Sequence, residues 1–170
     1  MREKNTQDKK NLKIRDCMTE DVLVVSRETP LKRIIQLLKE HNFHVLPVVE
    51  KNSKLVGIVT IDNILNLFQP YSSSLGQLLK ANPLLDDAIE PEDILLIDVS
   101  PELGKLVVAS DIMSENSPTI SPEESIEEAY TTMRLRNTDK LLVIDKDKKL
   151  LGIVTLFDII LALFKKRGVV

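Results

Sequence analysis

An internal repeat constrains the fold of this chain more than any local pattern does. The tripeptide at 16–18, Asp-Cys-Met, returns as Asp-Ile-Met at 111–113, and the hexapeptide at 55–60 returns almost unchanged at 150–155. Both pairs of segments are 95 positions apart, with no insertion or deletion between them. Since chance does not preserve register over such a length, the chain contains two copies of one unit of about 55 residues.

The repeat also predicts how the chain is divided. We expect a polar N-terminal tail at 1–11, a first copy at 12–68, a connecting segment at 69–108 and a second copy at 109–165. The connecting segment contains apolar runs and an acidic stretch. We expect it to form a short helix, a loop and either a strand or a second short helix.

Each copy opens with the same two elements. Short apolar segments at 22–25 and 118–120 predict a first strand. A helix follows in each copy. Thr29-Pro30 predicts an N-cap and a first-turn proline in the first copy, and Ser125 with Glu128 predicts a capping box in the second. The apolar residues of each helix recur at helical intervals, which predicts one buried face. They are Leu31, Ile34, Ile35 and Leu38 in the first copy, and Ile126, Ala129, Tyr130 and Met133 in the second.

A hairpin and a last helix complete each copy. In the first copy, apolar runs at 45–49 and 55–59 flank a polar loop at 50–54, and an amphipathic helix begins near Ile61; Leu156 begins the matching helix. The order is strand, helix, strand, strand, helix. A unit this short buries too little surface to be stable alone. We therefore expect a mixed α/β (α+β) fold of two pseudo-symmetric motifs, packed sheet to sheet as one module.

Composition narrows the class of protein. Lys and Arg number 23 against 26 Asp and Glu, a net charge of −3, so a nucleic-acid duplex is not an expected partner. One cysteine and two histidines exclude a disulfide framework and a structural Cys/His zinc site, and we expect no metal. No apolar stretch approaches the ~20 residues that cross a bilayer, and no signal peptide is recognisable. We expect a soluble, cytoplasmic protein with no membrane partner.

The repeated fragments recur in one order in both copies: 16–19 with 111–114, 46–49 with 141–144, and 57–60 with 152–155. This order resembles the tandem CBS (cystathionine-β-synthase) motif pair, often called a Bateman module. The resemblance implies a non-catalytic regulatory module that requires no cofactor. It implies an adenosyl ligand, AMP, ADP, ATP or S-adenosylmethionine, bound between the motifs. It also implies signalling by a conformational shift to a protein on another chain.

The last strand of the second copy leads into its last helix through Thr155-Leu156-Phe157-Asp158. A carboxylate there can hold the two hydroxyls of a ribose, while the threonine hydroxyl and free N–H groups can reach a phosphate. From spacing alone, the pattern favours a plain capping box that satisfies its own helix. With the resemblance added, Asp158 and Thr155 are predicted ligand contacts.

The resemblance implies further contacts in the second copy. Family members often carry a basic pair just before the first hairpin strand, and here only Lys140 remains, which predicts a phosphate contact. With so few cations, tight triphosphate binding is not expected. The first strand is expected to contact the adenine through Ser117, Pro118, Thr119 and Ile120, with Ile120 also in the core.

The first copy departs from the pattern at the same place. Asn63 stands where Asp158 stands, Thr60 matches Thr155, and His44 is the remaining residue of the basic pair. An amide oxygen still accepts hydrogen bonds, but it lacks the charge that makes such bonds stronger. We predict a weaker or empty first-motif site at these three positions.

Two other functions stay open. In a ligand-free dimerisation and interaction scaffold, both Thr-x-x-acid turns serve only as caps. An enzyme is the least supported, because the sequence shows no Ser-His-Asp set, no phosphate loop and no clustered metal ligands. The resemblance also implies a homodimer, to which Phe68, Leu163 and Phe164 can contribute apolar contacts.

Overall fold

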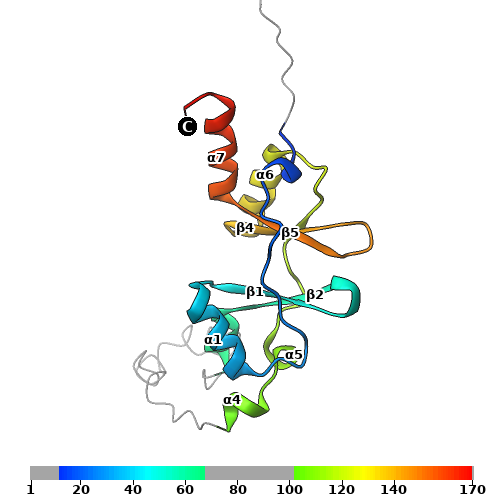
Figure 1. The fold of residues 1–170 in the computed structure, drawn as a ribbon, viewed down its shortest axis with the longest axis vertical. Helices are drawn as coiled ribbons and strands as arrows, with labels where there is room; N and C mark the ends of the chain where they lie inside the picture. Colours follow the sequence, from blue (N-terminus) through cyan, green and yellow to red (C-terminus); the bar gives the residue numbers. More distant parts are fainter. Residues whose placement is uncertain (1–11, 68–101, 170) are drawn as a thin grey trace, which may run out of the picture. The chain divides into compact units, whose positions relative to one another are not determined.

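The computed structural model describes residues 12–67 and 102–169. They form two compact units, each with helices packed on a small sheet (Figure 1). Unit 1 contains 12–23, 50–55 and 116–169, and unit 2 contains 24–49, 56–67 and 102–115. The predictions for the tail at 1–11, for the acidic stretch and for Phe68 lie outside the described residues.

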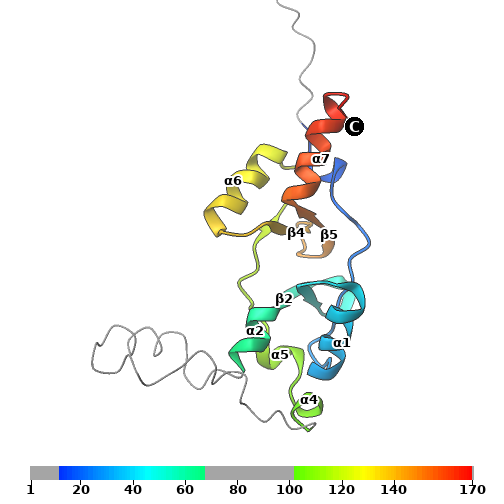
Figure 2. The same ribbon diagram turned by 90° about the vertical axis from the view of Figure 1, so that its left-hand side faces the viewer.

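Unit 1 is a three-stranded sheet with two helices on one face (Figures 1 and 2). Its elements are the 3-10 helix η1 (Ile14–Asp16), β3 (Thr119–Ile120), α6 (Ile126–Arg136), β4 (Lys140–Ile144), β5 (Leu150–Thr155) and α7 (Leu156–Lys166). β3 pairs in parallel with β4, and β4 pairs antiparallel with β5. The two longer helices pack on this sheet and on each other.

The core of unit 1 follows from the alternation of side chains along its strands. Leu141, Val143 and Val154 are fully buried under the helices. Because successive side chains point to opposite faces, Lys140 and Thr155 belong to the other face of the sheet. The remaining buried members of the core are Ile14, Ile120, Ile126, Ala129, Met133 and Ile159.

Unit 2 repeats this plan with a two-stranded sheet. Its elements are α1 (Leu31–His41), β1 (Val45–Val49), β2 (Leu55–Thr60), α2 (Ile61–Asn66), α4 (Leu103–Leu106) and α5 (Ala109–Ile112). The hairpin loop forms the 3-10 helix η2 (Lys51–Ser53), which together with Leu55 belongs to unit 1. The mixed α+β class and the order of elements are confirmed. In the part of the chain that the structure describes, no helix is both long and apolar enough to span a bilayer.

The predicted first strand at 22–25 is wrong in extent. Only Val25 pairs, in parallel with Val48; its N–H donates to the Pro47 carbonyl at 3.0 Å, and the Val49 N–H donates to its carbonyl at 2.9 Å. The Val22 N–H instead donates to the Glu20 carbonyl at 3.1 Å. That local bond ends the extended pairing after one bridge.

The start of the first long helix also differs from the prediction. Pro30 occupies the N-cap position and the helix begins at Leu31, whose N–H donates to the Val107 carbonyl at 2.8 Å. Thr29 does not cap the helix, because its hydroxyl oxygen accepts the N–H of Ser26 at 3.0 Å. A backbone carbonyl from a distant segment therefore replaces the expected side-chain cap.

The capping box of α6 is confirmed. The Ser125 N–H and hydroxyl each donate to Glu128 Oε2 at 2.8 Å, and the Glu128 N–H donates to Ser125 Oγ at 3.2 Å. The backbone hydrogen bond from Ser125, followed by the one from its hydroxyl, lowers the pKa of the Glu128 carboxyl.

The segment that opens each sequence copy packs in the unit that contains the hairpin of the other copy. In unit 1, the Ile14 N–H donates to the Glu124 carbonyl at 3.0 Å, and Thr19 pairs with Ile153 through two hydrogen bonds of 2.9 Å. Unit 2 repeats these contacts 95 positions away: Ala109 N–H to the Thr29 carbonyl at 2.9 Å, and Ser114 paired with Ile58. Each unit thus combines the hairpin of one copy with the opening segment of the other.

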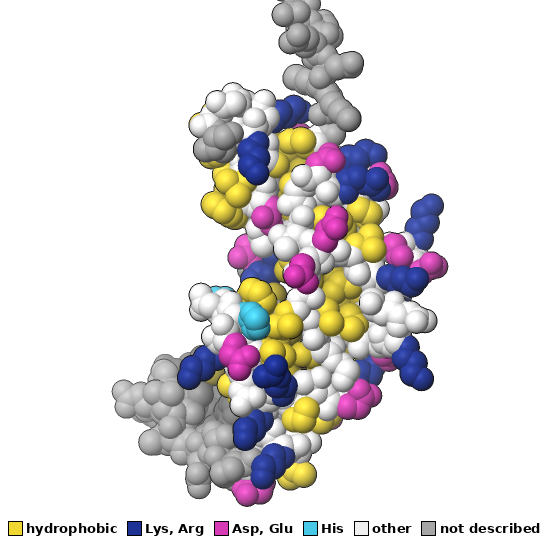
Figure 3. All heavy atoms as spheres, in the orientation of Figure 1, with side chains coloured by type: hydrophobic (Ala, Val, Ile, Leu, Met, Phe, Trp, Pro, Cys, Tyr) yellow, Lys and Arg dark blue, Asp and Glu magenta, His cyan; other side chains and the backbone are white. Residues whose placement is uncertain are grey.

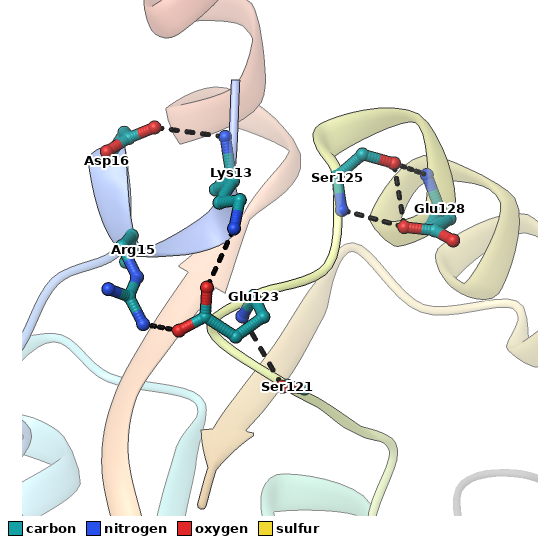
Figure 4. Close-up of polar contacts among 7 residues, drawn as sticks. All are labelled: Lys13, Arg15, Asp16, Ser121, Glu123, Ser125 and Glu128. Atoms are coloured by element: carbon teal, nitrogen blue, oxygen red, sulfur yellow. Dashed lines mark hydrogen bonds and ion pairs between the residues drawn. The ribbon is translucent and has the colours of Figure 1, made fainter. Parts of the chain in front are cut away.

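Polar contacts reinforce this exchange in unit 1 (Figure 4). Glu123 lies between Lys13 and Arg15 of the opening segment and pairs with both, at 2.8 Å from Lys13 Nζ. These side chains are about half exposed, and exposed ion pairs contribute only about 0.2–1 kcal/mol each. The fully buried Ile14 and the backbone hydrogen bonds therefore contribute more to holding the segment.

Two glycines permit the crossing of the opening segments over the hairpins. A Cβ added to Gly152 lies 2.6 Å from the Thr19 carbonyl oxygen, and one added to Gly57 lies 2.9 Å from that of Ser114. The obstructing atoms are backbone atoms in paired segments, so they cannot move aside as a flexible side chain can.

Substitution Gly152→Ala tests this close approach. We expect the overpacked crossing to lower the free energy of unfolding by about 1–3 kcal/mol. For a chain of this length, each kcal/mol lowers Tm by roughly 2–4 °C, which thermal unfolding measures directly. The matched control is Gly104→Ala, whose added Cβ meets its nearest atom, Lys32 Cβ, at an ordinary 3.5 Å. Equal losses in the two variants contradict the close approach.

Candidate functional site

The strand register of unit 1 brings several predicted ligand contacts to the same end of its sheet, where β4 begins and β5 ends. Lys140 at the start of β4 is paired with Thr155 at the end of β5. The parallel register of β3 and β4 places Ser117, just before β3, at the same end as Lys140. Since α7 begins directly after Thr155, it holds Asp158 in its first turn at this end.

Thr155 and Asp158 form a complete capping box. The Thr155 N–H and hydroxyl donate to Asp158 Oδ2 at 2.8 and 2.7 Å, and the Asp158 N–H donates to Thr155 Oγ1 at 3.2 Å. The plain cap that the spacing allows is therefore formed. Both bonds to the carboxylate use one oxygen, and no hydrogen bond within the described residues reaches Oδ1. The cap thus leaves one charged acceptor for a ligand.

Lys140 is paired only locally. Its Nζ lies 3.3 Å from Asp139 Oδ1, and the Asp139 side chain is 71% exposed. Such a pair contributes little, so an anion can replace Asp139 as the partner of this ammonium. The backbone on either side is fixed: Leu156 N–H donates to the Asp139 carbonyl at 2.8 Å.

The residues predicted to contact adenine lie in β3 and the two positions before it. Ile120 is 4% exposed and belongs to the core, and the Pro118 carbonyl accepts the Leu142 N–H at 3.0 Å. Thr119 pairs with Leu142 in the parallel register. The hydroxyl oxygen of Ser117 is buried and has no hydrogen-bond partner among the described residues. Because an unsatisfied buried hydroxyl is unfavourable, a polar group of a ligand can stabilise this position.

The opening segment brings Cys17 into the vicinity of Asp158. Burial raises the pKa of the Cys17 thiol to about 11, and the carboxylates of Asp158 and Asp16 add to this effect. The thiol lies 3.5 Å from the Ile14 carbonyl oxygen, to which it donates. It is therefore neutral at pH 7 and weakly reactive.

The first copy reproduces the capping geometry without the charge. The Thr60 N–H and hydroxyl donate to Asn63 Oδ1, both at 2.9 Å, and the Asn63 N–H donates to Thr60 Oγ1 at 3.2 Å. His44 is exposed, and its carbonyl accepts the Ile61 N–H at 3.4 Å. In place of Cys17, the exchanged segment carries Ile112. The turns at Thr60 and Thr155 thus form the same capping hydrogen bonds, but only the second contains a carboxylate.

Sequence reasoning missed a pocket in unit 1 beside Asp139 and Leu156. It has a volume of about 450 Å³ and lies where α6 ends and α7 begins. Its lining residues are Tyr130, Met133, Arg134, Asn137, Thr138, Asp139 and Leu156. The helical spacing predicted a buried Tyr130, yet its side chain is 49% exposed, as is Ile35 at 45%. These two positions lie at the border of the apolar face, where the pattern alone does not determine burial.

Comparison with known proteins agrees with this architecture. Residues 14–69 and 109–165 match the family model of the CBS domain. The chain therefore belongs to the CBS domain family. It is 30% identical over 156 residues to the uncharacterized protein MJ1426 of Methanocaldococcus jannaschii, covering 88% of this chain and 90% of that protein. It also spans 45% of the length of MJ1404, a longer relative from the same organism.

Solved structures show the same fold. The structure of CBSX2 in complex with AMP, a protein from Arabidopsis thaliana, superimposes with a TM-score of 0.64 at 24% identity, covering 91% of this chain and 98% of that one. The CBS domain pair of protein MJ0100, in complex with 5-methylthioadenosine and S-adenosyl-L-methionine, has a TM-score of 0.61 at 21% identity, covering 92% and 98%. At these identities the likeness establishes the fold alone.

The environment of Cys17 gives a testable pH dependence. Because its folded pKa is about 11 and its ordinary value is 9.0, alkylation by iodoacetamide should stay slow through pH 9 and rise only toward pH 11. The stability that the neutral thiol contributes is complete below pH 9 and is lost as the pH rises toward 11. Asp158→Asn should shift the rise in labelling to lower pH, whereas Asp111→Asn in unit 2 should not. Rapid labelling of the folded wild type at pH 8 contradicts this environment.

Proposed function

We propose that this protein is a non-catalytic regulatory sensor that binds an adenosyl ligand at the second-motif site. Asp158 holds the ribose hydroxyls through its free oxygen, Thr155 and Lys140 contact the phosphate, and residues 117–120 enclose the adenine. One observation carries the proposal: at one end of the sheet lie a carboxylate oxygen of Asp158 and a buried hydroxyl of Ser117, neither of which has a hydrogen-bond partner among the described residues.

Membership of the CBS family supports a regulatory, nucleotide-binding role rather than catalysis. Two structural neighbours, CBSX2 and the MJ0100 domain pair, carry AMP and S-adenosyl-L-methionine, respectively. For this chain, we propose AMP, ADP, ATP or S-adenosylmethionine as the ligand class. The ligand acts by shifting the population of conformations that meet a regulated protein on another chain, in the cytoplasm.

The first-motif site at Thr60, Asn63 and His44 is the weaker one in this proposal. Its threonine and amide oxygen satisfy each other as in the second copy, so the group that Asn63 has left for a ribose is its side-chain NH2, which donates hydrogen bonds and does not accept them. Since hydrogen bonds to charged acceptors are roughly twice as strong as neutral ones, the ligand occupies the Asp158 site first.

Asp158→Asn tests the contribution of the free carboxylate oxygen to binding, because it removes the charge and replaces that acceptor with an NH2 group while keeping the cap. Asn63 already forms the same cap in the first copy, so this variant should keep its fold. Losing two charge-assisted bonds to the ribose should weaken binding about tenfold or more. We would identify the ligand with a thermal-shift panel of adenosyl compounds and cyclic dinucleotides at millimolar concentration, then measure affinities by calorimetry.

The matched control is Asn63→Ala, which removes the equivalent cap from the first copy. It should cost about 1 kcal/mol of stability and leave the affinity of the second-motif site unchanged. Unaltered affinity in Asp158→Asn contradicts the assignment of the ribose site. If no compound in the panel stabilises the wild type, the ligand-free scaffold replaces the sensor as the better description.

We further propose that the protein forms a homodimer through apolar side chains of its last helices. Leu163 and Phe164 of α7 are 37% and 45% exposed, and Figure 3 shows hydrophobic side chains at the surface in the region of this helix. Exposed apolar residues that gather on one helix are typical of association surfaces.

Sedimentation at micromolar concentration tests the dimer. The wild type should sediment as a dimer, and Phe164→Asp should shift it toward the monomer by placing a charge in the apolar contact. The control Leu106→Asp changes an exposed residue of α4, outside the proposed contact, and should remain dimeric. A monomeric wild type contradicts the proposal.

A further inference from the structure

The pocket at the end of α6 is lined by two residues that neighbour proposed ligand contacts in the sequence. It begins at Asp139 and Leu156, each next in sequence to a proposed phosphate contact, Lys140 and Thr155. A hydrogen bond of 2.8 Å from the Leu156 N–H to the Asp139 carbonyl joins the two walls. Because Lys140 Nζ lies 3.3 Å from Oδ1 of Asp139, which lines the pocket, an anion held by Lys140 lies beside this pocket.

The pocket wall offers hydrogen-bond donors. Arg134 contributes a guanidinium, Tyr130 a phenol hydroxyl and Asn137 a side-chain amide. Across 12–67 and 102–169, none of these three side chains has a hydrogen bond or an ion pair. Met133 and Leu156 contribute the apolar part of the lining. The one acidic residue of the lining, Asp139, is already paired with Lys140.

The first copy provides an internal comparison. Positions 95 residues earlier carry Ile35 for Tyr130, Lys39 for Arg134 and Phe43 for Thr138. Ile35 and Phe43 are 45% and 44% exposed, so the matching surface of unit 2 has apolar groups in place of the phenol and the threonine hydroxyl, and the ammonium of Lys39 in place of the guanidinium. The guanidinium and the phenol occur in the copy that also has the Asp158 carboxylate and Lys140. Two features required for a nucleotide, a ribose acceptor and anion donors, therefore coincide in one copy.

From this coincidence we propose that the pocket is the anion subsite of the second-motif site and that Arg134 binds the phosphate of the ligand. The inference rests on the proposed function and narrows it: the ligand class is a phosphorylated adenosine rather than adenosine or a neutral adenosyl thioether. The phosphate replaces Asp139 as the partner of Lys140 and accepts hydrogen bonds from the guanidinium, whose planar fork matches phosphate oxygens. The volume of about 450 Å³ falls within the roughly 300–1,000 Å³ that is typical of small-molecule sites.

Arg134→Gln tests the subsite when AMP and adenosine are titrated in parallel into the full chain. The variant should weaken AMP binding about tenfold and leave adenosine binding unchanged, because only AMP carries the anion. The matched control is Arg136→Gln, which removes the same charge from the last turn of the same helix, at a position that does not line the pocket. It should change neither affinity.

The outcomes separate this inference from the proposed function. Equal affinities of the wild type for AMP and adenosine, or equal losses for both ligands in Arg134→Gln, overturn the anion subsite and leave the sensor intact. An equal loss of AMP affinity in Arg136→Gln also overturns it, since general charge then accounts for the effect. If neither ligand binds the wild type, the anion subsite is overturned, and the adenosyl site fails as well when S-adenosylmethionine also does not bind.

Discussion

The crossing of an opening segment over a hairpin glycine is the contact on which each unit depends. In unit 1 the bridge between Thr19 and Ile153 passes over Gly152, and in unit 2 the bridge between Ser114 and Ile58 passes over Gly57. Each crossing brings residues of one sequence copy into the core of the other. Ile14, for example, belongs to the first copy and is fully buried in unit 1. Neither copy completes a core alone, so the duplication is a structural requirement of this fold.

In unit 1, the same crossing places a side chain near the turn that Thr155 and Asp158 form. Cys17 arrives beside Asp158, and burial together with that carboxylate keeps its thiol neutral. At the matching position of the other opening segment stands Ile112, a purely apolar residue, in the unit whose turn ends in a neutral Asn63. Unit 1 therefore combines a carboxylate at the turn with a thiol from the other copy, whereas unit 2 combines a neutral amide with an aliphatic side chain. The proposed ligand site thus draws on both copies, with most of its polar groups in the second.

Features determined by neighbouring residues could be predicted from the sequence. The capping boxes and the hairpins depend on side chains a few positions apart, and the repeat fixed the order of elements. The exchange could not be predicted, because its backbone hydrogen bonds join residues such as Ile14 and Glu124 that no local pattern relates. For the same reason, Leu31 takes its cap from Val107 rather than from Thr29. The pocket was missed because the exposure of Tyr130 depends on how α6 packs, and Arg134 belongs to no motif.

Comparison of the two copies separates the requirements of folding from those of binding. The capping bonds at Thr60 and Thr155, the bonds to Ile14 and Ala109, and both strand crossings recur with nearly equal lengths. Because an asparagine forms the same cap as an aspartate, folding does not demand the charge of Asp158. Nor does it demand a donor-rich pocket, since the first copy has Ile35 and Phe43 at the matching places. The second copy thus has three groups that its fold does not require. They are the free carboxylate oxygen of Asp158, the guanidinium of Arg134, which has no partner among the described residues, and the ammonium of Lys140, which is paired only with Asp139. These groups have in common that the phosphorylated nucleoside proposed above would satisfy all of them.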